Sequence, residues 1–115
     1  MRSIYKYEIT EQAMPLNAPI TRFLSVQVQH DRICVWAEVD TEMKDRHFLF
    51  TIIGTGWELD KINNFDKTTY LGTVQCLGGD YIWHIYYLEL KVPYERLKNL
   101  KQKSNKREDR LVYPL

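Results

Sequence analysis

The chain has 115 residues, of which 44% are hydrophobic and 13% are aromatic. This length suits one domain with a buried core, and this composition excludes a chain that is disordered throughout. The net charge is +1, but residues 1–90 hold 8 Lys/Arg against 12 Asp/Glu, a net −4, whereas residues 91–115 hold 8 against 3, a net +5. An acidic body with a basic C-terminal segment is therefore the main asymmetry of the chain.

Membrane insertion and secretion are not indicated. No run approaches the ~18 apolar residues of a membrane span, and residues 1–10 lack the apolar core of a secretory signal. Both cysteines, Cys34 and Cys76, fall in predicted strands. We expect two reduced, buried thiols in a cytoplasmic protein, with a single disulfide as the alternative.

The chain begins with a predicted strand over residues 3–9 (SIYKYEI), in which residues on alternating positions form one aromatic face. Thr10 to Pro19 contains two prolines with an asparagine between them, so it predicts an irregular connection.

Leu24 to Asp40 predicts a β-hairpin, because two runs with an apolar residue at every second position flank the polar pair His30-Asp31. One face of this hairpin mixes glutamines with Cys34, Trp36 and Glu38. The other face is apolar and is expected to be core: Leu24, Val26, Val28, Val35, Ala37 and Val39.

Further along, His47 to Ile53 predicts a central strand with apolar residues on both faces, and a long polar loop follows it through Thr68. Tyr70 to Leu90 predicts a second hairpin, in which Gly72 indicates a bulge or a close backbone approach. Pro93 then predicts the start of a short helix through about Gln102.

Together these elements predict a β domain over residues 1–90 and a helix with a basic tail over residues 91–115. The fold class is mainly β: an antiparallel sheet of about six strands forming a sandwich or partial barrel, with one short C-terminal helix. Outer strands such as residues 3–9 need cover, and a homo-oligomer paired through an edge would provide it.

The sequence indicates neither a metal nor a cofactor. The three histidines fall on a turn, a strand start and a strand centre, without a CxxC, HxH or HExxH pattern. Cys76 and His84 lie on strands expected to pair, so a small hydrolase that uses His84, with Cys76 or a carboxylate, is one reading. The competing reading is an inert thiol and a hydrogen-bonded core histidine, and we expect no enzyme.

Binding is the expected activity. A Gly-Thr-Gly turn presents backbone N–H groups that suit an anion, although its alternative is a tight turn with positive φ. Amides, an aromatic ring and a carboxylate on the polar hairpin face suit a polar ligand. The residues predicted to bind a ligand or partner are Gln27, Gln29, Trp36, Glu38, Gly54, Thr55, Gly56, Trp57 and His84.

The basic C-terminal segment suits phosphate contacts, which makes nucleic-acid binding an alternative function. Glu108 and Asp109 interrupt the segment and no aromatic residues interleave to stack bases, so a solubilising end is preferred. Its basic residues are Lys98, Lys101, Lys103, Lys106, Arg107 and Arg110.

Seven short motifs follow one another along the chain, and their order and spacing are informative: IYKY near the start, Met14-Pro15, LSVQVQ, VWAEVD, FTIIGTG, YLGT and Trp83-His84. In this order they resemble a family of small proteins of unknown function encoded by bacteriophages and prophages. The resemblance covers about residues 4–90. Relatives often carry a histidine where this chain has Trp57, and the helix and tail extend past the usual end of the family.

The resemblance implies a phage accessory protein that is made in the host cytoplasm and acts by binding, without a catalytic mechanism. Its partner would be a host defence protein or a small polar ligand such as a nucleotide-type signal. Nucleic-acid binding and hydrolysis remain the alternatives.

Overall fold

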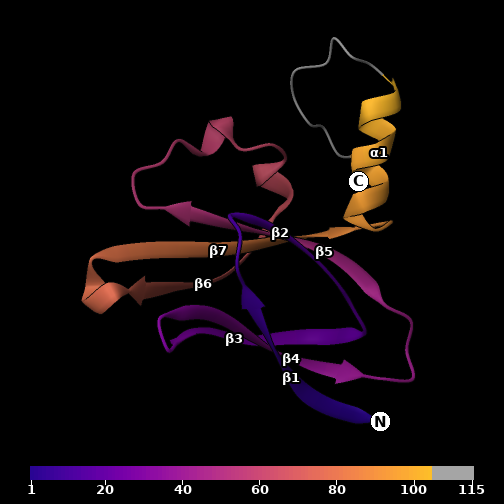
Figure 1. Cartoon of the computed structure of the whole chain (residues 1–115), viewed down its shortest axis with the longest axis horizontal. Helices are drawn as coiled ribbons and strands as arrows, with labels where there is room; N and C mark the ends of the chain where they lie inside the picture. Colours follow the sequence, from indigo (N-terminus) through magenta and orange to yellow (C-terminus); the bar gives the residue numbers. More distant parts are fainter. Residues whose placement is uncertain (105–115) are drawn as a thin grey trace.

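The computed structural model describes residues 1–104, in which seven strands form two antiparallel sheets that pack face to face (Figure 1). The three-stranded sheet has the order β1-β4-β3, with β1 Arg2–Ile9, β3 Ile20–Gln29 and β4 Arg32–Asp40. The four-stranded sheet has the order β2-β5-β7-β6, with β2 Ala13–Ala18, β5 Arg46–Gly54, β6 Thr69–Cys76 and β7 Tyr81–Leu90. One helix, α1, covers Tyr94–Ser104. The predicted fold class, a mainly antiparallel β protein with one C-terminal helix, is confirmed, and neither sheet closes into a barrel over these residues.

Aromatic rings fill the space between the two sheets. Phe23 of β3 lies with its ring centroid 5.0 Å from Phe48, 5.4 Å from Phe50 and 4.7 Å from Tyr87. Such edge-on and tilted contacts suit the positive edge and negative face of each ring. The apolar residues of both inner faces surround this group, and they include Ile9, Val26, Val35, Val39 and Ile85.

Two predictions about the first third of the chain are wrong. The segment predicted as an irregular connection contains β2, where Pro15 pairs with Leu49. Because β2 is an edge strand, a proline there need not break the ladder. Leu24 is 38% exposed rather than buried, since the pairing of β3 with β4 shifts register between Phe23 and Ser25 and leaves Leu24 without a partner on β4.

The two hairpins form as predicted. His30 and Asp31 have φ of 52° and 62°, the conformation of a two-residue type I′ turn. In the second hairpin, Gly72 marks both a register shift and a close approach, because a Cβ at this position would lie 2.4 Å from Cγ1 of Val26. Both interpretations of this glycine are therefore confirmed.

The outer face of the four-stranded sheet has two covers (Figure 1). Leu97 of α1 packs against Leu49, Leu88 and Leu90 at one end of the face. The loop between β5 and β6 lies over the other end and contains two 3₁₀ turns, Leu59–Lys61 and Phe65–Lys67. From this loop the ring of Phe65 contacts Tyr86, 4.9 Å between centroids.

Candidate functional site

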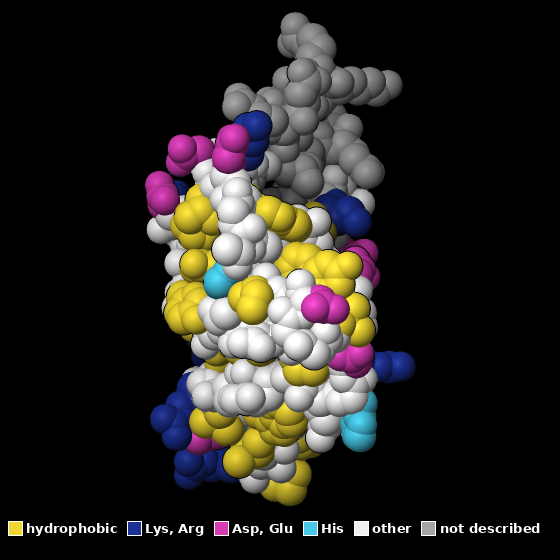
Figure 2. Space-filling view, turned by 90° about the vertical axis from the view of Figure 1, so that its left-hand side faces the viewer, with side chains coloured by type: hydrophobic (Ala, Val, Ile, Leu, Met, Phe, Trp, Pro, Cys, Tyr) yellow, Lys and Arg dark blue, Asp and Glu magenta, His cyan; other side chains and the backbone are white. Residues whose placement is uncertain are grey.

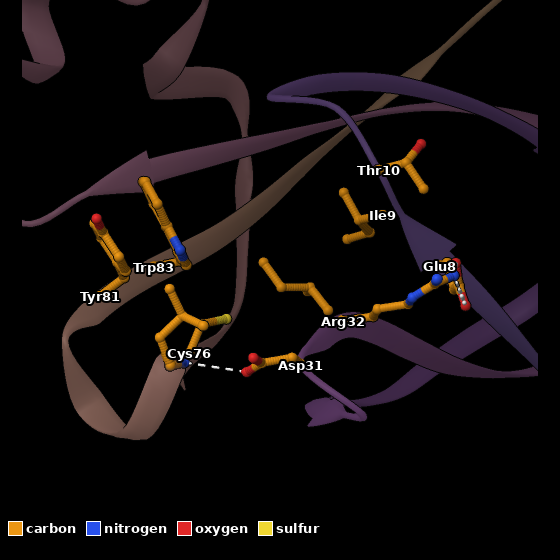
Figure 3. Close-up of a pocket in the computed structure, with 10 residues that line it drawn as sticks. Glu8, Ile9, Thr10, Asp31, Arg32, Cys76, Tyr81 and Trp83 are labelled. Atoms are coloured by element: carbon orange, nitrogen blue, oxygen red, sulfur yellow. Dashed lines mark hydrogen bonds and ion pairs between the residues drawn. The ribbon is translucent and has the colours of Figure 1, made fainter.

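A cleft of about 500 Å³ opens at the end of the sandwich where the β3–β4 turn and the β6–β7 turn meet. Its size lies within the range of small-molecule sites. Figure 3 shows two aromatic side chains of β7 on one side of it and the end of β1 on the other. The lining residues are Glu8, Ile9, Thr10, Asp31, Arg32, Ile33, Cys76, Leu77, Tyr81 and Trp83.

The aromatic wall consists of Tyr81 and Trp83, which share the inner face of β7 because side chains two apart in a strand point the same way. Their rings are stacked, with centroids 6.1 Å apart and planes 7° apart. Trp57 adds a third ring, edge-on to Trp83 at 5.9 Å. Tyr81 is 51% exposed and Leu77 is also exposed, so hydrophobic side chains gather on the surface at this end of the molecule (Figure 2).

The floor of the cleft is apolar. Ile9 and Ile33 come from the paired ends of β1 and β4, and both are buried. Cys76 is also buried, and burial raises the pKa of its thiol, with the negative charge of Asp31 raising the pKa further. The thiol is therefore protonated over the physiological range and is a poor nucleophile.

The rim carries charge. Nη1 of Arg32 lies 3.2 Å from Oε2 of Glu8, so these two side chains neutralise each other. Asp31 accepts a hydrogen bond of 3.1 Å from the backbone N–H of Leu77 through Oδ1, which ties the two turns together. Because this partner is uncharged, the lining keeps a net charge of −1.

The structure divides the predicted binding residues into two groups. The Gly54–Trp57 turn and His84 lie at the same end as the cleft. The turn closes with a 3.2 Å hydrogen bond from Trp57 N–H to Gly54 O, and Gly56 has φ of +91°, as the third residue of a type II turn requires. Gly54 serves packing, since a Cβ there would lie 2.7 Å from Nε1 of Trp57.

His84 lies on the outer face of β7, between two threonine hydroxyls. Its Nε2 is 2.8 Å from Oγ1 of Thr55, and its Nδ1 is 2.9 Å from Oγ1 of Thr73. Tyr70 extends this chain through a 2.6 Å contact with the Thr73 hydroxyl. The ring is thus held by hydrogen bonds, as predicted, but His84 is half-buried on an outer face rather than part of the core.

Cys76 and His84 do not meet. Their strands pair, as predicted, but Cys76 is opposite Tyr81 and His84 is opposite Thr73, so the two side chains point to opposite faces of the sheet. The prediction that Cys76 could act with His84 is therefore wrong.

The second group of predicted residues lies on the outer face of the three-stranded sheet. Gln27 donates to Ser25 Oγ at 3.0 Å, Gln29 accepts from Lys6 Nζ at 2.6 Å, and Glu38 pairs with Arg22 at 2.8 Å. The Arg22 hydrogen bond lowers the pKa of Glu38. Trp36 lies half-buried in the middle of this network. The glutamines and Glu38 thus have neighbouring side chains as partners, and none of the four predicted residues on this face lines the cleft.

Of the basic C-terminal residues, Lys98 lies in α1 with its ammonium group 5.5 Å from the Tyr94 ring centroid. Lys101 and Lys103 fall within α1, and the remaining predicted nucleic-acid contacts, Lys106, Arg107 and Arg110, lie outside the described residues.

Sequence reasoning missed the cleft itself. Its walls come from segments about 70 residues apart, and no local pattern joins them. One feature of the sequence does point to it. Tyr81 and Trp83 lie on the same face of a strand, directly after the turn of the second hairpin, and His30-Asp31 forms the turn of the first hairpin. Hairpins that pack face to face can bring such turns to one end of a sandwich.

Over residues 1–104, no group of three or more His, Cys, Asp or Glu side chains is placed to hold a metal ion. No helix in this part of the chain is long and apolar enough to cross a membrane.

Neither the curated proteins nor the solved structures include a match to this chain. A family described as "Domain of unknown function (DUF7352)" matches residues 1–95, which span all seven strands and the start of α1. The chain therefore belongs to this family of unknown function.

Proposed function

We propose that the protein is a non-catalytic binding protein whose ligand occupies the cleft at the end of the sandwich. The cleft carries this proposal, because it combines an apolar floor, an exposed aromatic wall and a few charged groups at the rim. This combination is typical of small-molecule sites, in which apolar walls supply affinity and a few polar groups fix orientation.

The charge of the lining selects among ligands. Glu8 and Arg32 neutralise each other and Asp31 leaves a net negative charge. A neutral or positively charged flat ring can stack on Tyr81 while its polar end faces Asp31. A nucleotide-type ligand fits this cleft in one orientation. Its base would stack on Tyr81 and its phosphates would point to solvent, away from the carboxylates of Glu8 and Asp31.

The biological setting is also a proposal. The order and spacing of the motifs resemble proteins of phages and prophages, and we infer that this chain is a phage accessory protein acting in the host cytoplasm. It would counter host defence by sequestering a small signal molecule or by blocking a host protein. A host protein would meet the exposed ring of Tyr81 and the exposed Leu77 first.

Hydrolysis by His84 is the competing proposal, because Thr55 Oγ1 lies 2.8 Å from Nε2, the spacing of a nucleophile and its base. The other ring nitrogen meets the Thr73 hydroxyl, which cannot stabilise an imidazolium ion as a carboxylate does. The binding proposal is therefore preferred.

The test is native mass spectrometry of the protein purified from a bacterial lysate, followed by extraction of any bound small molecule. We expect a bound mass in the wild type and in Tyr70→Ala, and its loss in Tyr81→Ala. The control is matched because both tyrosines are about half exposed on the same sheet, and Tyr70 lies on the outer face.

Equal retention of the bound mass by both variants would place the ligand elsewhere. A wild type that carries no small molecule and captures none from the lysate would contradict small-ligand binding. If the released compound is chemically changed and His84→Gln instead retains an unchanged compound, the hydrolase proposal is correct.

A further inference from the structure

The two sheets have four edge strands, and three of them carry a feature that discourages pairing with another chain. β2 contains Pro15, β3 has two register shifts, and β6 has a register shift at Gly72. Prolines and bulges are standard means of protecting an edge. β1 differs, because its eight residues pair with β4 in one unbroken register and include neither proline nor glycine.

The free edge of β1 presents a defined set of backbone groups. Thr41 N–H donates to Met1 O at 2.9 Å, in continuation of the β1–β4 register. Because backbone groups of successive residues point to opposite sides of a strand, the odd-numbered residues of β1 bond to β4. The N–H and C=O groups of Arg2, Ile4, Lys6 and Glu8 therefore point away from the sheet.

The side chains of β1 leave this edge open. A lysine on an edge strand can prevent pairing with another chain. The Lys6 ammonium does not do so here, because it donates a 2.6 Å hydrogen bond to Gln29 of β3, across β4, and therefore lies over the face of the sheet. Ile4 is 59% exposed and Tyr5 is 40% exposed, so an apolar side chain is available on each face of the strand.

We propose that β1 pairs antiparallel with β1 of a second copy of this chain, with Tyr5 on the two-fold axis. In this register Arg2 lies opposite Glu8 of the second copy, and Ile4 lies opposite Lys6. All four outward-facing residues then take part in hydrogen-bonded pairs, and each such pair exchanges two backbone bonds. The two three-stranded sheets become one six-stranded sheet.

Two criteria select this register among the symmetric ones that use the same backbone groups: the number of residues paired, and charge. An axis at Ser3 or Tyr7 would pair only two of the four outward-facing residues of β1. An axis at Ile4 would place Arg2 opposite Lys6, and an axis at Lys6 would place two ammonium groups opposite each other. Like charges directly opposite each other destabilise a strand pair, whereas opposite charges stabilise it. The axis at Tyr5 gives two Arg–Glu pairs and leaves no like-charged pair.

The pairing reaches the cleft, because Glu8 lines it. Arg2 of the second copy would approach the same carboxylate that Arg32 contacts, so each copy would contribute a positive charge to the rim of the other's cleft. This inference concerns assembly and stands whether or not the cleft binds a ligand.

Cysteine cross-linking tests the register. Cysteines introduced at Tyr5 would face each other in a non-hydrogen-bonded pair, with Cα atoms about 4.5 Å apart. Cysteines introduced at Ser3 would be offset by four residues, or about 13 Å. We expect Tyr5→Cys to give a covalent dimer on mild oxidation and Ser3→Cys to stay monomeric on a non-reducing gel, with the wild type controlling for its two buried cysteines. Equal cross-linking of both variants, or of neither, would overturn this register.

Sedimentation of the wild type over a range of concentrations tests the dimer itself. Ile4→Pro removes an N–H that faces the free edge and spares the β1–β4 ladder, so we expect the dimer dissociation constant to rise at least about tenfold. Arg2→Glu should weaken the dimer, and Arg2→Glu combined with Glu8→Arg should restore it. A wild type that is monomeric at every concentration would overturn the proposal, as would an unchanged dissociation constant in Ile4→Pro.

Discussion

Replacing Gly72 with alanine tests how tightly β6 approaches β3. The new Cβ would lie 2.4 Å from Cγ1 of Val26, well inside van der Waals contact. Gly72 does not have positive φ, so alanine suits its backbone and would by itself stabilise the protein by about 0.4–1 kcal/mol through the unfolded state. The contact with Val26 decides the outcome, because overpacking of a core costs about 1–3 kcal/mol.

We therefore expect Gly72→Ala to lower the free energy of unfolding by about 1–2 kcal/mol. Val26→Ala removes the methyl groups that the new Cβ would meet, and alone it should cost about 2 kcal/mol because it leaves a cavity in a buried site. In the double variant the added methyl group occupies the vacated space. The double variant should then be about 1–2 kcal/mol more stable than the sum of the single effects predicts.

Urea unfolding of the four proteins gives this coupling energy from the transition midpoints at constant m-value. Gly78→Ala is the matched control, because Gly78 has φ of +65° and a Cβ added there would meet no atom within 4 Å. Its cost of about 1–2 kcal/mol comes from the left-handed backbone, so Val26→Ala should not offset it. Strictly additive effects of Gly72→Ala and Val26→Ala would refute the close approach of the two strands.

The remaining predictions concern single side chains. Asp31→Asn removes a charge that raises the pKa of Cys76, so alkylation of Cys76 by iodoacetamide at pH 8 should become faster, and an unchanged rate would count against this electrostatic coupling. His84→Ala should lower the free energy of unfolding by about 1 kcal/mol, because it removes the hydrogen bonds to two threonine hydroxyls. The alkylation rate of Cys76 should stay the same in this variant, because Cys76 lies on the other face of the sheet. Hydrogen bonding to Arg46 lowers the pKa of Glu89. The ion pair therefore contributes fully to stability when the pH is above the ordinary carboxylate pKa, and this contribution is lost as the pH falls through the lowered pKa of Glu89 in the folded protein. Thermal unfolding from pH 6 to pH 3 should accordingly show a smaller loss of stability in Glu89→Gln than in the wild type.

The fold class was predictable because alternation is a local signal. The first hairpin shows it clearly: two alternating runs and a polar pair suffice to predict antiparallel strands, and the type I′ turn supplies the geometry. Leu24 was misassigned because a register shift depends on how β3 pairs with β4, which alternation within one strand does not reveal. The β2 strand was missed for a similar reason, since a proline is tolerated only at an edge and edges are a property of the whole sheet.

The candidate site was less predictable than the fold. Alternation predicts a polar hairpin face with Gln27 and Gln29, and amides without partners in the local sequence suggest a ligand. In the folded protein their partners are Ser25 and Lys6, which lie nearby only once the strands pair. The structure places Trp57 against Trp83, and this contact depends on the packing of the Gly54–Trp57 turn against β7, which no local pattern reveals.

The location and charge preference of the cleft can be measured directly by titrating the ¹⁵N-labelled protein with tryptamine and with indole-3-acetate, which share a ring and carry opposite charges. Binding in the cleft predicts amide shift changes centred on Ile9, Ile33 and Cys76. In the Ile4→Pro protein, kept monomeric so that Arg2 of a second copy does not reach the rim, tryptamine should bind about fivefold more tightly because of the net negative lining. Changes centred on Gln27, Gln29 and Trp36 instead, or tighter binding of indole-3-acetate, would contradict a cleft that accepts neutral or positively charged rings.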